Sequence, residues 1–305
     1  MLIFLARRIA MTVPVVLGVV FFVVLIVRIT PGNPALILLG QAATPEAVAS
    51  LEHELGLDES LPAQYGDYLR DLLHGNLGRS YRSGELVTSV IADALPNTLL
   101  LTFSGLAISL LIGLPIGIVS ALRRNTVWDH GLTVLSLLGL SMPVFWTGII
   151  LQWAVGYRLR LLPTSGIGGI EHLIMPAFAV GSYTAGNFAR MVRGTVLDVL
   201  GEEFIRTAWA KGLGFWRVLY HVIRNAILPV ITTIGLQVGL LLGGSILTET
   251  VFAWPGIGRA MVEAINSRDI VLTQGLVLVT ALLFVATNLI VDISYAFVDP
   301  RIKRS

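Results

Sequence analysis

The stretch LPNTLLLTFSGLAISLLIGLPIGIVSAL, residues 95–122, contains no charged side chain and decides the fold. A helix that crosses the hydrocarbon core of a bilayer needs about 20 mostly apolar residues. The same test finds five further charge-free segments, namely Ile9–Val27, Gly131–Tyr157, Leu173–Ala189, Ala226–Thr248 and Ile270–Val291. The sequence therefore predicts an all-α integral membrane protein with six transmembrane helices.

The amino-acid composition supports a membrane protein. Hydrophobic residues make up 55% of the 305 amino acids and charged residues only 13%. The charged share is about half of that in a typical soluble domain. A water-soluble fold of this length could not bury so much apolar surface. The sequence has no cysteine, which excludes disulfides, thiolate metal sites and a cysteine nucleophile.

Common motifs of catalysis and nucleotide binding are missing from the sequence. It has no Gly-x-x-x-x-Gly-Lys-Ser/Thr phosphate loop and no Gly-x-Ser-x-Gly nucleophile turn. The histidines lie far apart, without metal-ligand spacing, at His53, His74, His130, His172 and His221. A membrane enzyme is therefore the weaker hypothesis, and we expect neither a cofactor nor a metal in this chain.

The distribution of positive charge predicts the orientation, because Lys and Arg concentrate in cytoplasmic loops. With the N-terminus inside, 13 of the 21 Lys and Arg residues lie inside, including both lysines. An even number of spans then places both termini in the cytoplasm. The first segment follows Arg7 and Arg8 as a signal peptide would, but it is long and no small-residue cleavage site comes after it. We therefore expect a retained anchor.

Residues 30–94 form a long polar region that is expected outside the membrane. It carries nine acidic residues and three arginines. Thr44-Pro-Glu-Ala is typical of a helix start, and the spacing of Leu and Tyr residues predicts two short amphipathic helices. The region is interpreted either as a solvated cap over the first helix or as a docking surface for an extracytoplasmic partner.

Residues 194–225 form the main inside segment. The pattern predicts a short helix over Glu202–Lys211, with Phe204, Ile205, Ala208 and Trp209 on one apolar side. Gly212-Leu-Gly214 should end it, because glycine tolerates the left-handed conformation that follows many helices. A second helix, Phe215–Leu228, leads into the fifth span. Such an element can lie flat on the membrane or bind a cytoplasmic partner.

Within the spans, small residues recur at every fourth position, which allows close helix packing. They form a stripe in the second span (Gly105, Ser109, Gly113, Gly117), in the fourth (Ala177, Gly181, Ala185, Ala189) and in the fifth (Gly235, Gly239, Gly243). Gln237 and the neighbouring Gly239 of the stripe are the best candidates for a water-lined pathway, with Ser141, Asn187 and Thr147 as weaker ones. For each of them a packing contact is an equal alternative. Pro115 and Pro143 should bend the second and third spans.

Several motifs together resemble one family. EFIRTAWAKGL at 203–213 resembles the coupling-loop motif of binding-protein-dependent ABC importer permeases, and RNAILP at 224–229 is similar to their dipeptide, oligopeptide and nickel branch. Further stretches of the chain are similar to motifs of the same branch: ELGLD at 54–58, GRSY at 78–81, SMPVFW at 141–146, ETVFAWPGIG at 249–258, NLIVD at 288–292 and DPR at 299–301. Arg206-Thr-Ala208 stands where the wider superfamily has Glu-Ala-Ala. Leu228-Pro229 also comes about one helical turn later than in sugar permeases, which argues against a sugar or amino-acid permease.

The resemblance implies a type I (MetI-like) importer permease with an extracytoplasmic insertion after helix 1, of the first-permease (peptide permease B) type. Expected partners are a second homologous permease in a heterodimer, two ATPase subunits or domains that hold ATP and Mg²⁺, an extracytoplasmic solute-binding protein, and the lipid of a bacterial plasma (inner) membrane. No nucleic acid is expected. By resemblance, the helix that docks into the ATPase carries Glu203, Phe204, Arg206, Thr207, Ala208, Trp209, Lys211 and Gly212.

The resemblance implies transport of di- or oligopeptides by alternating access. The alternatives are the same fold importing nickel, glutathione or another small solute, and a membrane enzyme or channel. The chain is expected to divide into residues 1–94, the anchor helix with the extracytoplasmic region, and residues 95–305, a five-helix permease core with the coupling loop 194–225.

Overall fold

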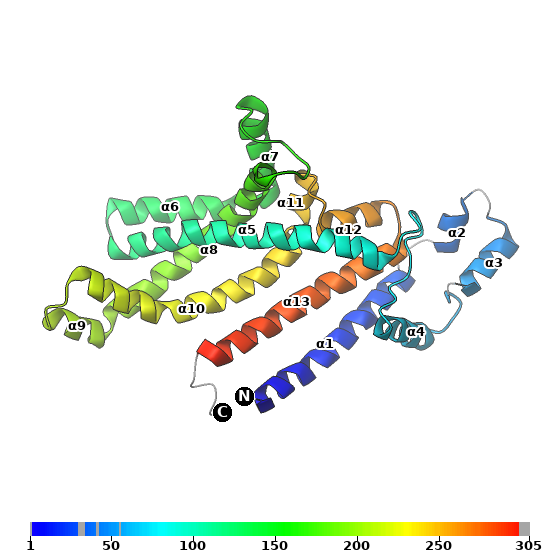
Figure 1. Ribbon diagram of the computed structural model, residues 1–305, viewed down its shortest axis with the longest axis horizontal. Coiled ribbons are helices and arrows are strands. Elements are labelled where there is room, and N and C mark those ends of the chain that lie inside the picture. Colours follow the sequence, from blue (N-terminus) through cyan, green and yellow to red (C-terminus); the bar gives the residue numbers. More distant parts are fainter. Residues whose placement is uncertain (1, 30–33, 41–42, 55, 299–305) are drawn as a thin grey trace. The chain divides into compact units, whose positions relative to one another are not determined.

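The structure is a computed structural model that describes residues 2–29, 34–40, 43–54 and 56–298 (Figure 1). Within these ranges the protein is helical, with one isolated antiparallel bridge between Arg79 and Leu86. The predicted all-α fold is confirmed. The chain forms two compact units, Met1–Asn97 with Gly256–Leu289, and Thr98–Pro255 with Ile290–Ser305. The sequence-based division at residue 94 stays a prediction.

The first unit contains the N-terminal helix and the polar region that follows it. Thr44 caps α3 (Pro45–Glu54), because its Oγ1 accepts a hydrogen bond of 3.2 Å from the amide of Ala47, as the sequence predicted. Three prolines in the charge-free stretch 29–45 argue against a helix there, but the short helix α2 (Pro34–Leu39) begins at Pro34, since proline fits a first helical position. The helices of this unit are α1 (Leu2–Ile29), α2 (Pro34–Leu39), α3 (Pro45–Glu54), α4 (Leu61–Leu73), the start of α5 (Val87–Leu122), α12 (Ile257–Asn266) and most of α13 (Ile270–Val298).

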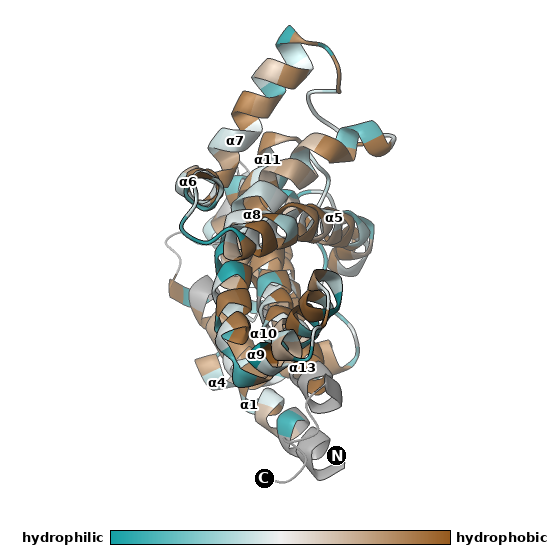
Figure 2. Ribbon diagram, turned by 90° about the vertical axis from the view of Figure 1, so that its left-hand side faces the viewer, coloured by the Kyte–Doolittle hydropathy of each residue, from teal (hydrophilic) through white to brown (hydrophobic). Residues whose placement is uncertain are grey.

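The second unit contains most of α5 and the remaining long helices. They are α6 (Val127–Ser141), α7 (Val144–Leu151) with a π-helical turn (Gln152–Arg158), α8 (Ile170–Gly201), α9 (Glu203–Ala210), α10 (Phe215–Gly244) and α11 (Ile246–Val251). Figure 2 shows hydrophobic residues along α5 and hydrophilic ones around α9. This contrast agrees with the prediction of apolar membrane spans and a polar segment over residues 194–225.

By length and composition alone, α5 and residues 270–291 of α13 are long and apolar enough to cross a membrane. Two bent pairs raise the number of candidates to four, and the apolar part of α1, Ala10–Leu25, is shorter. The fourth predicted span lies in α8, which is not among these candidates. Its small and polar residues lower its hydropathy, and many of them are buried against neighbouring helices.

The third predicted span is not one straight helix. It breaks after α6, and α7 with its π-helical turn leaves at 97°. Met142 is extended (φ −89°, ψ 122°), because a residue that precedes proline is disfavoured in the helical conformation. The bend predicted at Pro143 is confirmed as a full break. In contrast, α5 continues through Pro115 as a single helix.

Helices α5 and α8 pack backbone to backbone through the two predicted small-residue stripes. A Cβ atom added to Gly113 would lie 2.8 Å from the carbonyl oxygen of Ala185, and one added to Gly117 would lie 2.6 Å from that of Ala189. On the other side, a Cβ at Gly181 would lie 2.7 Å from the carbonyl oxygen of Gly105. These stripes therefore serve packing within the chain. Only glycine permits so close an approach.

Candidate functional site

The short helix α9 packs through one side against α8 and α10 of the second unit. Ile205 is 1% exposed and belongs to a hydrophobic cluster with Val192 and Val196 of α8 and Val218 and Val222 of α10. Ala208, one turn later, is half-buried against the same cluster. A displacement of α9 must therefore act on both long helices.

The other side of α9 is exposed. Phe204 is 45% exposed and Trp209 is 47% exposed. The expected single apolar side is therefore divided in two, because α8 and α10 cover Ile205 and Ala208 but leave the two aromatic rings uncovered. Exposed polar residues of the predicted set surround these rings: Glu203, Arg206, Thr207 and Lys211.

Gly212 ends α9 in the left-handed conformation, with φ +77°. The amide of Leu213 donates to the carbonyl of Ala208 at 3.2 Å, and that of Gly212 donates to the carbonyl of Trp209 at 2.9 Å. This pair of bonds defines a Schellman motif. A side chain at Gly212 would meet no atom within 4 Å, so the need for glycine lies in its backbone conformation alone. The predicted helix, stop and second helix are all present.

Four of the pathway candidates lie on three helices of the second unit, α6, α8 and α10. Ser141 is exposed and donates to its own helix, at the carbonyl of Leu137. Asn187 is half-buried and accepts a hydrogen bond from Arg190 at 3.3 Å. Gln237 is half-buried and Gly239 is buried, both in α10. None of the four lines the cavity of about 200 Å³ between α5, α6 and α8. Their role in a pathway stays a prediction.

A buried acidic residue that the sequence reasoning missed lies at the start of α6. The carboxylate of Asp129 forms a bidentate ion pair with Arg193 of α8, at 2.7 Å and 2.8 Å. Ser120 of α5 donates to it at 2.6 Å, and the amide of Asn125 donates at 2.9 Å. These four residues are called the Asp129 cluster below. In the sequence, this site could have been noticed only from the charge of Asp129, which lies at the edge of the apolar segment Gly131–Tyr157.

Two further buried carboxylates were also missed. Glu249 of α11 accepts hydrogen bonds from Thr98 at 2.8 Å and from Ser245 at 3.1 Å. Asp269 accepts from Ser80 and caps α13 through the amide of Leu272 at 3.1 Å. The two carboxylates belong to separate units. Glu249 is part of the quoted motif at 249–258, and Asp269 contacts Ser80 of the motif at 78–81.

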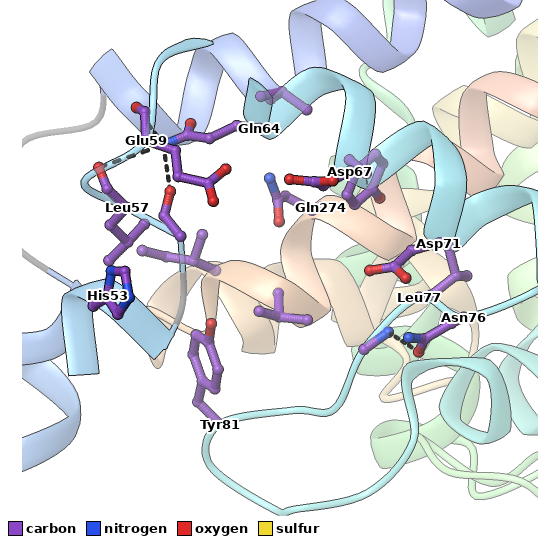
Figure 3. A pocket seen from close by; sticks show the side chains of 16 residues that line it. His53, Leu57, Glu59, Gln64, Asp67, Asp71, Asn76, Leu77, Tyr81 and Gln274 are labelled. Carbon is purple, nitrogen blue, oxygen red and sulfur yellow. Dashed lines mark hydrogen bonds between the residues drawn. The ribbon is translucent and has the colours of Figure 1, made fainter. Parts of the chain in front are cut away.

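The first unit contains a polar cavity of about 400 Å³ (Figure 3). Burial raises the pKa of Tyr68 to about 12, and the pKa of Tyr81 to about 12 with a smaller effect from Asp269. The hydroxyl of Tyr68 is buried and has no hydrogen-bond partner among the described residues. Acidic and amide side chains line the cavity: Glu59, Asp67, Asp71, Gln64, Asn76 and Gln274.

Comparison with known proteins places the chain in a family. Residues 113–304 match the family "Binding-protein-dependent transport system inner membrane component", and residues 1–102 match its N-terminal companion family. The dipeptide transport system permease of Alkalihalophilus pseudofirmus is 41% identical, over 99% of this chain and 100% of the relative. The di/tripeptide permease of Pseudomonas aeruginosa and the dipeptide permease of Escherichia coli K12 are each 38% identical, over 99% of both chains.

A solved structure shares the fold. A chain of the MetNI methionine ABC transporter, in an inward-facing conformation, superposes with a TM-score of 0.60 at 16% identity, over 69% of this chain and 96% of that chain. At this identity the likeness concerns the fold alone. The family resemblance drawn from the motifs is confirmed, and the chain belongs to the membrane permease subunits of binding-protein-dependent ABC importers.

Proposed function

We propose that this chain forms half of the translocation pathway of a bacterial importer for di- or oligopeptides. The observation that carries the proposal is the arrangement of α9, which is anchored by Ile205 and exposes Phe204 and Trp209. The choice of peptide rests on the relatives, whose names are dipeptide or di/tripeptide permeases over almost the whole chain.

In this proposal α9 docks into a groove of a separate ATPase subunit that binds ATP and Mg²⁺. The two aromatic rings fill the groove, and Glu203, Arg206 and Lys211 pair with charged groups at its rim. Because Ile205 packs on α8 and α10, movement of the ATPase subunits on ATP binding is transmitted to both helices. Hydrolysis resets the pathway to the outside. A second, homologous permease supplies the other half of the pathway.

The orientation belongs to the same proposal. Both termini and α9 lie in the cytoplasm of a bacterium, in its plasma (inner) membrane, and α3 and α4 lie outside, where a solute-binding protein delivers the peptide. Single cysteines in this cysteine-free chain test the orientation. Ser50→Cys, exposed in α3, should react with a membrane-impermeant thiol reagent in intact cells, and Arg217→Cys, exposed in α10, should react only after lysis.

Transport itself is tested by reconstitution. The chain is placed in proteoliposomes with its partner permease, its ATPase subunits and the binding protein, and uptake of labelled dipeptide is measured. We expect uptake that needs both ATP and the binding protein, and no ATP hydrolysis by the isolated chain. Uptake of nickel or glutathione without uptake of peptide would favour the alternative substrates. ATP hydrolysis by the isolated chain would contradict the subunit assignment.

A further inference from the structure

The Asp129 cluster uses every acceptor position of one buried carboxylate. Asp129 is 1% exposed, and each of its oxygens accepts two hydrogen bonds, one from Arg193 and one from Ser120 or the amide of Asn125. Asn125 adopts the left-handed conformation (φ +59°), which turns its amide toward the carboxylate. A bidentate guanidinium–carboxylate pair fixes both distance and orientation.

The cluster joins three helices at the same level. Ser120 belongs to the last turn of α5, Asp129 to the first turn of α6, and Arg193 to α8. The ion pair spans 64 residues of sequence. It therefore holds the α5–α6 corner against α8.

Side-chain packing between α6 and α8 is incomplete next to the cluster. Farther along, the helices touch closely, since a Cβ on Gly186 would collide with the carbonyl oxygen of Ser136. Between that contact and the ion pair lies the cavity of about 200 Å³, lined by residues such as Thr133, Ser136, Ala189 and Arg193. Because the cavity interrupts the packing, the spacing of α6 and α8 at this level depends on the Asp129 cluster.

The same segment of α8 leads directly to α9. The helix continues without a break from Arg193 to Gly201, and α9 begins at Glu203. Val192 and Val196, on either side of Arg193 along α8, belong to the same hydrophobic cluster as Ile205 of α9. A movement of α9 therefore reaches Arg193 through rigid helix and packed side chains.

We propose that Asp129 and Arg193 are positioning residues for coupling: their ion pair stays closed through the transport cycle and makes the start of α6 follow α8 when α9 moves. This inference rests on the coupling role proposed for α9. Without the ion pair, α8 would move together with α5, which packs on it at Gly117, while the start of α6 lags behind, and ATP hydrolysis would be uncoupled from the pathway.

The test replaces the ion pair by a bond that can be made and broken in the assembled complex. Asp129→Cys and Arg193→Cys are combined in this cysteine-free chain, which is assembled with partner subunits whose cysteines have been replaced. The stimulation of ATP hydrolysis by the peptide-loaded binding protein is measured before bridging with a short bifunctional methanethiosulfonate, after bridging, and after reduction. Before bridging, we expect the stimulated increment of the double-cysteine variant to be at least about fivefold below that of the wild type. A fivefold change corresponds to the lower end of typical coupling free energies. The increment should recover on bridging and fall again on reduction.

A role in folding alone would not produce this reversible recovery, because the complex has assembled before the bridge forms. A full increment without the bridge, or a low increment with it, would overturn the proposal. If the double variant does not assemble, Arg193→Lys serves instead. It keeps the charge but loses the bidentate geometry, so a reduced increment is expected and a normal one overturns the proposal. Asp198→Ala, at an exposed position of α8, is the matched control and should couple normally.

The coupling role of α9 and the positioning role of the Asp129–Arg193 ion pair can be tested separately. If Phe204→Ala with Trp209→Ala abolishes the stimulated increment while the unbridged cysteine pair does not, only the role of the ion pair is wrong. If the α9 variant keeps the full increment, the coupling role of α9 is wrong.

Discussion

The hydroxyl of Thr98 in α5 donates a hydrogen bond of 2.8 Å to the carboxylate of Glu249, which is completely buried in α11. Ser245 donates a second bond to the same carboxylate oxygen at 3.1 Å. A buried carboxylate is tolerated only when donors replace the water that it has lost. The contact therefore stabilises the attachment of α11 to α5 within the second unit.

Removing the Thr98 hydroxyl should destabilise the protein, whereas removing a neighbouring one should not. Thr98→Val takes a donor from Glu249, and we expect a loss of about 1–3 kcal/mol in the free energy of unfolding. The hydroxyl of Thr102 is equally buried but has no hydrogen-bond partner among the described residues. Thr102→Val should therefore be neutral or stabilising. Thermal unfolding of both variants in detergent checks this, and equal losses would contradict it.

Replacing glycine by alanine should have opposite effects on stability at Gly117, which packs against α8, and at Gly131, which is exposed in α6. Gly117→Ala places a Cβ 2.6 Å from the carbonyl oxygen of Ala189, and we expect a loss of about 1–3 kcal/mol through overpacking. Gly131 is exposed in α6, and a Cβ there would meet nothing within 4 Å. Gly131→Ala should stabilise by about 0.5–1 kcal/mol, because alanine is the better helix former. The same unfolding assay applies. A stable Gly117→Ala protein would show that the two helices are not in backbone contact.

The contact between His53 and Asp58 predicts a pH effect in the first unit. Their side chains lie 2.9 Å apart, and this hydrogen bond raises the pKa of His53 above 6.5 and lowers the pKa of Asp58 below 3.8. The stabilisation is lost as the pH rises through the raised pKa of His53, and also as it falls through the lowered pKa of Asp58. NMR titration of labelled histidine in micelles should give a pKa above 6.5. Asp58→Asn should lower it, and an unchanged value would show that the contact does not form.

The left-handed backbone of Gly212 makes a prediction about coupling. Gly212→Val forces a β-branched residue into this conformation, at about 1–2 kcal/mol, and should change the angle between α9 and α10. Asparagine adopts the conformation more readily, so Gly212→Asn should retain most of the function. Peptide-stimulated ATP hydrolysis of the two reconstituted variants is compared. Equal activities would mean that the angle set at Gly212 does not matter.

Sequence patterns predicted those features that depend on neighbouring residues. The spacing of Gly113, Gly117 and Ala185 indicated close packing, and Gly212 indicated the end of α9. Pro143 indicated a bend, but the angle of 97° depends on the packing of α7 against α8 and α11. The apolar periodicity of α9 could not show which apolar residues are covered, because α8 and α10 decide that.

The ion pair of Asp129 with Arg193 could not be predicted from the sequence, because it joins residues 64 positions apart. Either residue alone is an ordinary charge at the end of a membrane segment. Only the packing of α6 on α8 brings them together, and the sequence contains no local signal of that pairing. The same holds for Thr98 and Glu249, which are 151 positions apart.

In the proposed function, α9 couples this permease to a separate ATPase through its exposed aromatic side. The most direct measurement is peptide-stimulated ATP hydrolysis by the reconstituted complex with Phe204→Ala and Trp209→Ala combined. Trp216→Ala is the control, because Trp216 is 78% exposed but lies beyond Gly212, on α10. We predict that the stimulated increment falls about tenfold or more in the α9 variant, since buried aromatic anchors dominate protein interfaces. The control should keep it. A full increment in the α9 variant, with the complex assembled, would show that the aromatic side of α9 does not couple the two subunits.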